Sequence, residues 1–401
     1  MLTTATVAPP HLAPSGAPSH LAPSGAPSHP APSHPAPSRL RAEVVTDYDA
    51  FLGLETEWND AVARARVPHP FLRHEWIRTW WDAFGASARL HILIVRDETG
   101  ITAIAPLMRE TTRTYGVPAT TLRFIQNDHT PRIDFIIADR PDESYEAIWK
   151  ALRSGGESWD VLQLSQLPRT SPTVATITRF AKAEHLHTGV WQSGDSPYLE
   201  LAGSWDGYLA SLPAKFRSNI RNRMSRLTKL GEPTFEVLRD RAAIEAGYAD
   251  ALRLEASGWK AQEGTSICSD PAVQRFYAML TERATERGWL ELLFLKVGDR
   301  RIATSYGSTY DGRLFLFKTG YDPEYATCSP FKLLTYFAIQ HAYGHGLREV
   351  DFLGDSEPWK LEWTTNARSH DWLFVYADNC RARLLHSIKF QWVPELKRWR
   401  A

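Results

Sequence analysis

Three strand-like segments in succession, WLELLFLKVGDRRIATSYGSTYDGRLFLFKTG at residues 289–320, constrain the fold more than any other part of the chain. Gly298-Asp299 marks the first turn, and Asp311-Gly312 is a pair favoured in two-residue hairpins. Strands joined by turns this short can pair with their neighbours only in antiparallel order. The run therefore predicts an antiparallel meander.

A long amphipathic helix is predicted to begin just after the meander, at Ser329-Pro330, and to end at Gly346. Serine suits the cap because its hydroxyl can accept an orphan backbone N–H, and proline at the first position has no N–H to leave unpaired. Such a helix start can also bind an anion, and Lys332 adds a positive charge there. Because every helix has such an end, an ordinary helix start is the other interpretation.

The remaining pattern from residue 41 onward predicts an α+β protein built from two similar halves. Helical and strand-like patterns in the first half lie at 48–65, 73–84, 89–110 (a hairpin), 121–126, 133–138 and 159–167. Those of the second half precede the meander, at 213–230, 234–240, 242–257 and 272–288. The order is comparable in both halves, so two domains are predicted, each a mostly antiparallel sheet flanked by helices. Gly, Ser, Asp and Pro cluster at 194–203 and predict the boundary between domains at 41–200 and 201–401.

The first forty residues differ in kind from the rest. HLAPSGAPS occurs twice in succession and is followed by HPAPS, also twice. A segment of Pro, Ala, Ser and Gly cannot bury enough apolar surface to offset the entropy of ordering, so residues 1–40 are predicted to be a disordered tail. The tail lacks the basic start and apolar stretch of a secretory signal. A metal-binding role for its histidines is the less favoured alternative.

Composition limits the classes of function. The formal net charge is zero, so an anion site must be local rather than a property of the whole surface. Three cysteines far apart form no CxxC pair, which argues against a metal site and fits a cytoplasmic location. No apolar run approaches the roughly 20 residues that span a bilayer. The oligomeric state is left open.

A basic stretch, KFRSNIRNRMSRLTK at residues 215–229, carries no acidic residue. Its apolar residues fall at helical spacing, so one face is expected to pack and the rest to be positively charged. The stretch is either a solvated basic face or a surface that binds an anionic ligand. Its cations are Lys215, Arg217, Arg221, Arg223, Arg226 and Lys229.

Two further segments carry candidate catalytic groups. In EASGWK, Glu255 stands near the end of a predicted helix, ahead of Trp259 and Lys260. In VDFLGDSEPWK, Asp351 lies on an apolar strand where burial could raise the pKa of a carboxylate toward working pH, as a general base requires. Asp355, Glu357 and Lys360 follow in the next loop. The alternatives are a helix C-terminus with a packed Trp and a purely structural polar network.

These features together resemble the GNAT superfamily of acyltransferases. The resemblance spans roughly residues 41–375 and is closest to the two-domain branch described as cellulose-biosynthesis-type acetyltransferases, which is related to Fem-type aminoacyltransferases. It is most specific in EASGWKAQEGTSI, in the meander with the following YDPEYATCSPFKLL, and in GLREVDFLGDSEPWKLEWT. The resemblance implies two tandem GNAT folds, with the acyl-donor site in the second.

The resemblance also implies residue roles. Thr319 and Gly320 would flank the thioester of acetyl-CoA, while Ser329, Phe331 and Lys332 would face its pyrophosphate. Phe331 stands where this branch typically has glycine. The proton acceptor would be Glu255 or Asp351, and the departing thiolate would be protonated by Tyr321 or Tyr325. The expected substrate-binding residues are Arg217, Arg221, Trp259, Lys260, Asp355, Glu357 and Lys360.

The function expected from the resemblance is transfer of an acyl group, most simply acetyl, from acyl-CoA to an amine or hydroxyl. The acceptor would be a small molecule, a saccharide or a cell-envelope precursor. One alternative is Fem-like aminoacyl transfer from tRNA, with the basic stretch as docking surface. The other is a non-catalytic GNAT pair that only binds, which Phe331 favours.

Overall fold

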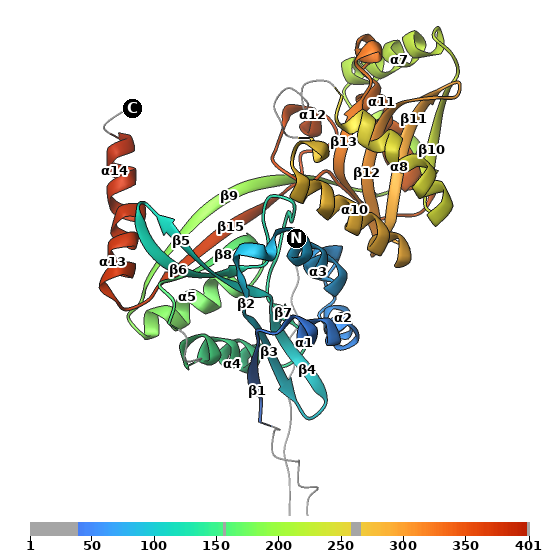
Figure 1. The fold of residues 1–401 in the computed structure, drawn as a ribbon. Helices are drawn as coiled ribbons and strands as arrows, with labels where there is room; N and C mark the ends of the chain where they lie inside the picture. The colour runs from blue at the N-terminus through green and yellow to red at the C-terminus, as the bar shows by residue number, and fades with distance from the viewer. Residues whose placement is uncertain (1–38, 155–157, 258–265, 399–401) are drawn as a thin grey trace, which may run out of the picture. The chain divides into compact units, whose positions relative to one another are not determined.

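The computed structural model describes residues 39–154, 158–257 and 266–398. It confirms the α+β class, with mostly antiparallel sheets flanked by helices (Figure 1). All but the last two residues of the predicted tail lie outside the described ranges. Within those ranges, no helix is both long and apolar enough to cross a membrane.

The first half begins with a strand, continues through helices into hairpins, and ends in a long strand. Its elements are β1 (Arg41–Val45), α1 (Tyr48–Gly53), α2 (Glu55–Arg64), η1 (Pro70–Leu72), α3 (His74–Phe84), η2 (Gly85–Ser87), β2 (Arg89–Leu90), β3 (Ile92–Asp97), β4 (Gly100–Ala105), β5 (Leu107–Thr114), β6 (Val117–Phe124), β7 (Ile136–Ile137), α4 (Pro141–Ser154), β8 (Val161–Pro168), α5 (Thr173–Ala183) and β9 (His187–Glu200).

The second half contains the predicted meander and the long helix after it. Its elements are α6 (Trp205–Ser211), α7 (Ala214–Thr228), β10 (Pro233–Leu238), α8 (Arg241–Glu255), η3 (Ile267–Ser269), α10 (Pro271–Glu286), β11 (Leu290–Val297), β12 (Arg300–Tyr310), β13 (Arg313–Tyr321), η4 (Pro323–Cys328), α11 (Pro330–Gly344), β14 (Glu349–Asp351), α12 (Pro358–Leu361), β15 (Ala367–Tyr376), α13 (Cys380–Ser387), η5 (Ile388–Trp392) and α14 (Val393–Arg398).

The meander forms as predicted, with β11, β12 and β13 paired antiparallel. Asp311 and Gly312 both have positive φ, at 46° and 66°, as the tight hairpin turn requires. Almost every residue of β11 is buried, because α8 and α11 both pack against this strand. Buried on both faces, β11 reads as a nearly continuous apolar run rather than an alternating one.

Several sequence predictions need correction. The helix predicted at 48–65 is interrupted at Leu54, which caps both α1 and α2. The strand predicted at 133–138 shrinks to the two residues of β7. The helices α4 and α5 were not predicted, although each buries an apolar face.

Strands from both halves share one sheet of eleven strands, in the order β10-β11-β12-β13-β14-β9-β15-β8-β6-β5-β2. β9 runs through Gly194, inside the cluster of turn-forming residues, and pairs with β14 and β15. β15 in turn pairs with β8 of the first half. The domain boundary at residue 200 therefore remains a proposal, since strands of both halves pair with each other at β9 and β15.

The same topological unit occurs once in each half. In the second half, β13 leads through α11 to β14, and β13 and β14 pair in parallel only from Arg313–Phe315 to Glu349–Asp351. In the first half, β6 leads through the short strand β7 and then α4 to β8, with parallel pairing from Thr121–Arg123 to Val161–Gln163. In both units the two parallel strands separate beyond three paired residues.

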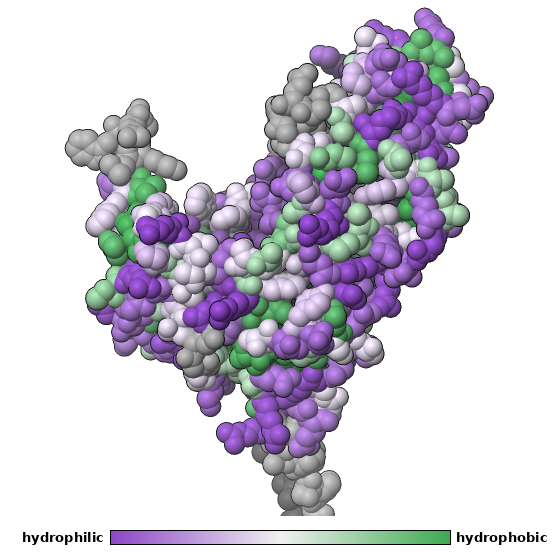
Figure 2. Space-filling model, in the orientation of Figure 1, coloured by the Kyte–Doolittle hydropathy of each residue, from purple (hydrophilic) through white to green (hydrophobic). Residues whose placement is uncertain are grey.

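Helix α13 and the π-helical segment η5 after it each carry an exposed large apolar side chain, and Figure 2 shows hydrophobic residues in green along this C-terminal segment. Leu384 is 41% exposed and Trp392 is 52% exposed. Two isolated apolar residues of this kind are common on protein surfaces.

Candidate functional site

A cavity of about 470 Å³ opens where β13 and β14 separate; we call it the strand cavity. Thr319, Gly320 and Tyr321 of β13 line it on one side. Phe331 from the first turn of α11 and Trp359 of α12 line it as well, with their rings 4.6 Å apart in an edge-on contact. The separation of the strands thus exposes the backbone of β13 to a ligand.

Gly320 lies directly against the end of α8. A Cβ at this position would stand 2.5 Å from the Cα of Glu255 and would clash with the carbonyl oxygen of Leu254. The contact therefore requires glycine, and it places the end of α8 behind the strand cavity. Ser257 lies at the same contact, because its hydroxyl oxygen is 2.6 Å from the carbonyl oxygens of both Leu254 and Tyr321, either of which can accept its single proton.

Glu255 is buried at this joint. Its Oε2 accepts a hydrogen bond of 2.8 Å from the backbone N–H of Ile267. Trp259 and Lys260, which the sequence groups with Glu255, lie outside the described residues. The role of Glu255 as proton acceptor stays a prediction.

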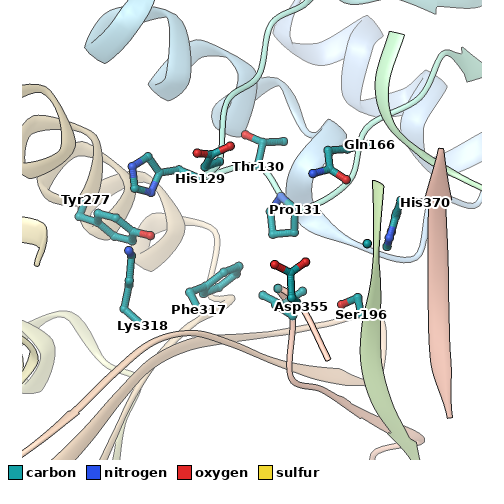
Figure 3. A pocket seen from close by; sticks show the side chains of 14 residues that line it. His129, Thr130, Pro131, Gln166, Ser196, Tyr277, Phe317, Lys318, Asp355 and His370 are labelled. Atoms are coloured by element: carbon teal, nitrogen blue, oxygen red, sulfur yellow. The ribbon is translucent and has the colours of Figure 1, made fainter. Parts of the chain in front are cut away.

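A second cavity of about 260 Å³ adjoins the first; we call it the polar cavity (Figure 3). Four residues line both cavities: Phe317, Lys318, Leu353 and Gly354. Figure 3 shows Asp355 in the middle of the polar cavity, with Gln166, Ser196 and His370 to one side and His129 and Tyr277 to the other. A ligand in one cavity can therefore meet a ligand in the other beside Lys318 and Leu353.

His370 has the features of a neutral proton acceptor. It is 3% exposed, and burial lowers its pKa to about 4, with the Arg132 guanidinium adding to the shift. The carbonyl oxygen of Gly194 accepts from the ring, while Nε2 has no hydrogen-bond partner among the described residues. Nδ1 therefore carries the proton, and Nε2, itself enclosed, keeps an unused lone pair on a ring that lines the polar cavity.

The opposite side of the polar cavity combines a cation, an imidazole and a phenol. The Lys318 ammonium stands 5.8 Å from the centre of the Tyr277 ring. Burial lowers the pKa of His129 to about 4, and Lys318 contributes to that shift, so His129 is neutral at pH 7.

Ser196 lies on the side of His370 in Figure 3. It is 4% exposed, and its hydroxyl has no hydrogen-bond partner among the described residues.

Asp351 is fully buried and held on several sides. Its Oδ2 accepts from Arg132 at 2.6 Å and from Arg368 at 3.3 Å. Its Oδ1 accepts from the backbone N–H of Leu353 at 3.0 Å, and Leu353 has a positive φ of 54°. These contacts support a structural role, because a carboxylate held by two arginines is a poor proton acceptor.

The start of α11 differs from the sequence prediction. Ser329 occupies the cap position, but its φ of 49° is left-handed and its side chain caps no helix N–H. Its hydroxyl instead accepts a hydrogen bond from Arg223 of α7. The predicted capping role of Ser329 is therefore wrong. Lys332 forms an ion pair with Glu362 and lies 5.4 Å from the Phe216 ring.

The structure brings together only part of the predicted site. Thr319, Gly320, Tyr321, Phe331, Glu357 and Lys360 line the strand cavity, and Asp355 lines the polar cavity. Ser329, Lys332 and Tyr325 are not among the described residues that line either cavity. Tyr325 lies under the guanidinium of Arg300, 5.4 Å away. Arg217 and Arg221 lie on α7, apart from both lining sets.

Lys360 of α12 stabilises the loop that follows β14. Its ammonium donates to the carbonyl oxygens of Leu353 and Asp355, at 2.7 and 2.9 Å. It also forms an ion pair of 3.1 Å with Glu357. These contacts hold the loop that separates the two cavities.

The sequence prediction missed His129, Lys318 and His370. Each lies in an element whose neighbours are distant in the chain, and none belongs to a recognisable short motif. A lysine and two histidines in otherwise apolar or strand-like stretches were the available signal. Residue type alone could not tell them from satisfied core groups. Within the described ranges, no cluster of His, Cys, Asp or Glu is arranged to hold a metal ion.

Part of the chain is similar in sequence to a known domain family. Residues 214–361 match a family model described as an acetyltransferase (GNAT) domain. These residues include β13, α11 and the strand cavity. No curated protein matches the chain in sequence.

Two solved structures are similar to the chain in fold. FemX is 13% identical over 83% of this chain and 98% of its own, with a TM-score of 0.55. The C-terminal domain, DUF2156, of a candidate lysylphosphatidylglycerol synthetase from Agrobacterium fabrum is 11% identical over 84% and 95%, with a TM-score of 0.51. The second half of the chain thus carries the match to a GNAT acetyltransferase domain, within a fold shared with FemX and DUF2156.

Proposed function

We propose that the protein is an acyltransferase that moves an acyl group, most simply acetyl, from acyl-CoA to an amine or hydroxyl. The observation that carries this proposal is the pair of adjoining cavities. The strand cavity offers the β13 backbone to a thioester, and the polar cavity presents hydrogen-bonding groups to an acceptor. The GNAT-domain match over residues 214–361 supports it.

The residues around the strand cavity suit acyl-CoA in two respects. Gly320 lets β13 pack closely on the end of α8, since any side chain there would strike that helix, and the strand lines the cavity beside it. The first turn of α11 contains no acidic residue, and Arg223 of α7 and Lys332, which pairs with Glu362, lie at this helix start. Phosphates bind favourably at such a position. Phe331, packed against Trp359, narrows the approach to the helix start.

In the proposed reaction, the acceptor nitrogen or oxygen forms a bond to the thioester carbonyl carbon, and the carbon–sulfur bond breaks. A backbone N–H near Thr319 and the ammonium of Lys318 would stabilise the negative charge that develops on the carbonyl oxygen. Nε2 of His370 would take the acceptor's proton, and Tyr321 would give a proton to the departing thiolate. Glu255 is the alternative proton acceptor.

The acceptor is proposed to be a polyhydroxyl molecule such as a saccharide or a cell-envelope precursor. Gln166, Ser196, Asp355 and His370 offer donors and acceptors at separate points around the polar cavity. Such a set suits a ligand with several hydroxyl groups. A cytoplasmic location and the cellulose-biosynthesis-type branch belong to the same proposal.

Fem-like aminoacyl transfer from tRNA is a second candidate, favoured by one observation. Four cations in and directly after α7 are exposed to solvent, namely Lys215, Arg221, Arg226 and Lys229. A nucleic acid docked there would bind with a strong dependence on salt.

Calorimetry with acetyl-CoA, CoA and a bulk aminoacyl-tRNA preparation tests the proposal directly. Acetyl-CoA should bind with a single site, and Gly320→Val should abolish the binding because the new side chain enters the α8 joint. Gly344→Ala, at the open end of α11, is the matched control and should bind normally. Binding of tRNA without acetyl-CoA would favour the Fem-like alternative, and binding of neither would leave the non-catalytic module.

A further inference from the structure

A third cavity, of about 460 Å³, lies in the first half and is separate from the strand and polar cavities; we call it the α4 cavity. It forms between the segment before α4 and the segment that joins β8 to α5. Pro141 and Tyr145 of α4 line it, and so do Phe135, Ile137 and Pro168. Most of its wall is therefore apolar.

The polar part of the α4 cavity holds two buried side chains that each have one nitrogen without a hydrogen-bond partner among the described residues. Arg132 is 5% exposed and His69 is 6% exposed, and both line the cavity. Neither Nε of Arg132 nor Nδ1 of His69 has a hydrogen-bond partner among the described residues. Buried polar groups are usually satisfied, so two orphans in one wall point to a missing ligand.

The lining of the α4 cavity contains more basic than acidic side chains. It includes Arg66, Arg132 and Arg368 but one carboxylate, Asp134. Arg132 and Arg368 also belong to an ionic cluster with Glu349, Asp351 and Arg313, and Arg313 pairs in addition with Asp311. His69 adds no charge, because burial and then Arg132 hold its pKa well below the usual range.

The arginines of the lining fit an anionic group, and the apolar wall fits a hydrocarbon body. Asp134 is itself engaged, since its Oδ1 accepts from Thr173 at 2.6 Å and from the Phe135 N–H at 2.7 Å.

We propose that the α4 cavity binds a small aliphatic monocarboxylate, with the carboxylate on Arg132 and His69 and the chain against Phe135 and Ile137. This site uses none of the residues assigned to acyl transfer. Its occupancy can therefore be tested whether or not the proposed reaction is correct.

The test is isothermal titration of the whole protein with sodium hexanoate and with hexanamide, its neutral analogue of the same length. Hexanoate should bind at one site at least ten times more tightly than hexanamide. Equal binding of the two probes, or no binding of hexanoate, would overturn the proposal. Binding of inorganic phosphate without hexanoate would overturn the carboxylate class.

Two variants locate the site. Arg66→Glu reverses a charge at the exposed rim and should weaken hexanoate binding at least tenfold, whereas Arg89→Glu, an exposed arginine outside the cavity, should leave it unchanged. Thr170→Trp places a large side chain at the exposed edge of the cavity and should block binding if Arg66→Glu folds poorly. Hexanoate binding that survives Thr170→Trp would place the ligand elsewhere.

Discussion

The unit β13–α11–β14 and the unit β6–α4–β8 have the same topology but opposite charge where the helix begins. Both consist of a strand, a helix and a second strand that runs parallel to the first over three residues. The first turn of α11 has no acidic residue and carries Lys332, whereas the first turn of α4 carries Asp142 and Glu143.

Because of this difference in charge, we expect the two units to bind different ligands. The positive end of a helix attracts an anion, and acidic side chains in the first turn neutralise that attraction. A pyrophosphate is therefore expected only at α11. The α4 unit has instead an apolar cavity whose positive groups lie on the preceding segment and on β15, at Arg132 and Arg368.

The largest expected effect is on turnover. His370→Gln removes the proposed proton acceptor of the polar cavity and should lower kcat by about 10²–10⁴-fold with the fold retained. Steady-state assays with acetyl-CoA, alongside circular dichroism, provide the measurement. Glu255→Gln is the comparison, and a loss of kcat confined to that variant would move the role to Glu255.

Charge reversal at the two helix starts tests the comparison itself. Lys332→Glu should weaken acetyl-CoA binding by roughly tenfold or more, since a negative charge then opposes the phosphates. Asp142→Lys in α4 should leave that affinity unchanged. Calorimetry measures the affinity of both variants for acetyl-CoA. Equal losses of affinity in the two variants would show that the phosphates of the donor are not at α11.

Corresponding strand positions of the two units should differ in stability. Asp351 and Gln163 occupy equivalent places, each at the third residue of the parallel pairing. Asp351→Asn should cost about 1–3 kcal/mol in the free energy of unfolding because it breaks a buried network with Arg132 and Arg368. Gln163→Ala should cost less than about 1 kcal/mol. Urea unfolding measures both, and activity of Asp351→Asn that falls beyond its folded fraction would contradict a structural role.

Acid should destabilise the folded protein through three buried histidines. Burial lowers the pKa of His69, His129 and His370 below the usual value of 6.5, in the last two to about 4. Between pH 6.5 and 4 the unfolded chain therefore binds more protons than the folded one, so the free energy of unfolding should fall as pH decreases. Urea titrations at each pH measure the slope, which His129→Gln should reduce.

The smallest effect concerns a residue that resembles a helix cap without acting as one. Ser329→Ala should change stability by about 0.5 kcal/mol or less, because its side chain caps no N–H. Asp270→Ala removes a real cap, which accepts from Ala272 and Val273, and should cost about 0.5–2 kcal/mol. Similar losses from thermal unfolding of both variants would restore Ser329 as a cap.

Local pattern was enough for the elements whose signals lie within a few residues. The meander, α3, α7, α8, α10 and α11 could be read from hairpin turns, periodicity and capping residues because these forces act between neighbours in the chain. The strand predicted at 133–138 was too long, since only the two residues of β7 pair with a neighbouring strand.

The candidate site likewise has one part that the sequence predicted and another that it did not. Thr319 and Gly320 end the meander and Phe331 follows soon after it, and the family resemblance grouped the three in one site. His370 and Gly194 are brought together only by the pairing of β15 with β9, and Arg132 meets Asp351 across 219 positions of sequence. Such contacts depend on sheet order, and sheet order depends on how whole surfaces bury one another. Short-range pattern therefore determined the strands, the helices and the β13 side of the strand cavity, whereas tertiary packing alone decided which buried charges and imidazoles surround them.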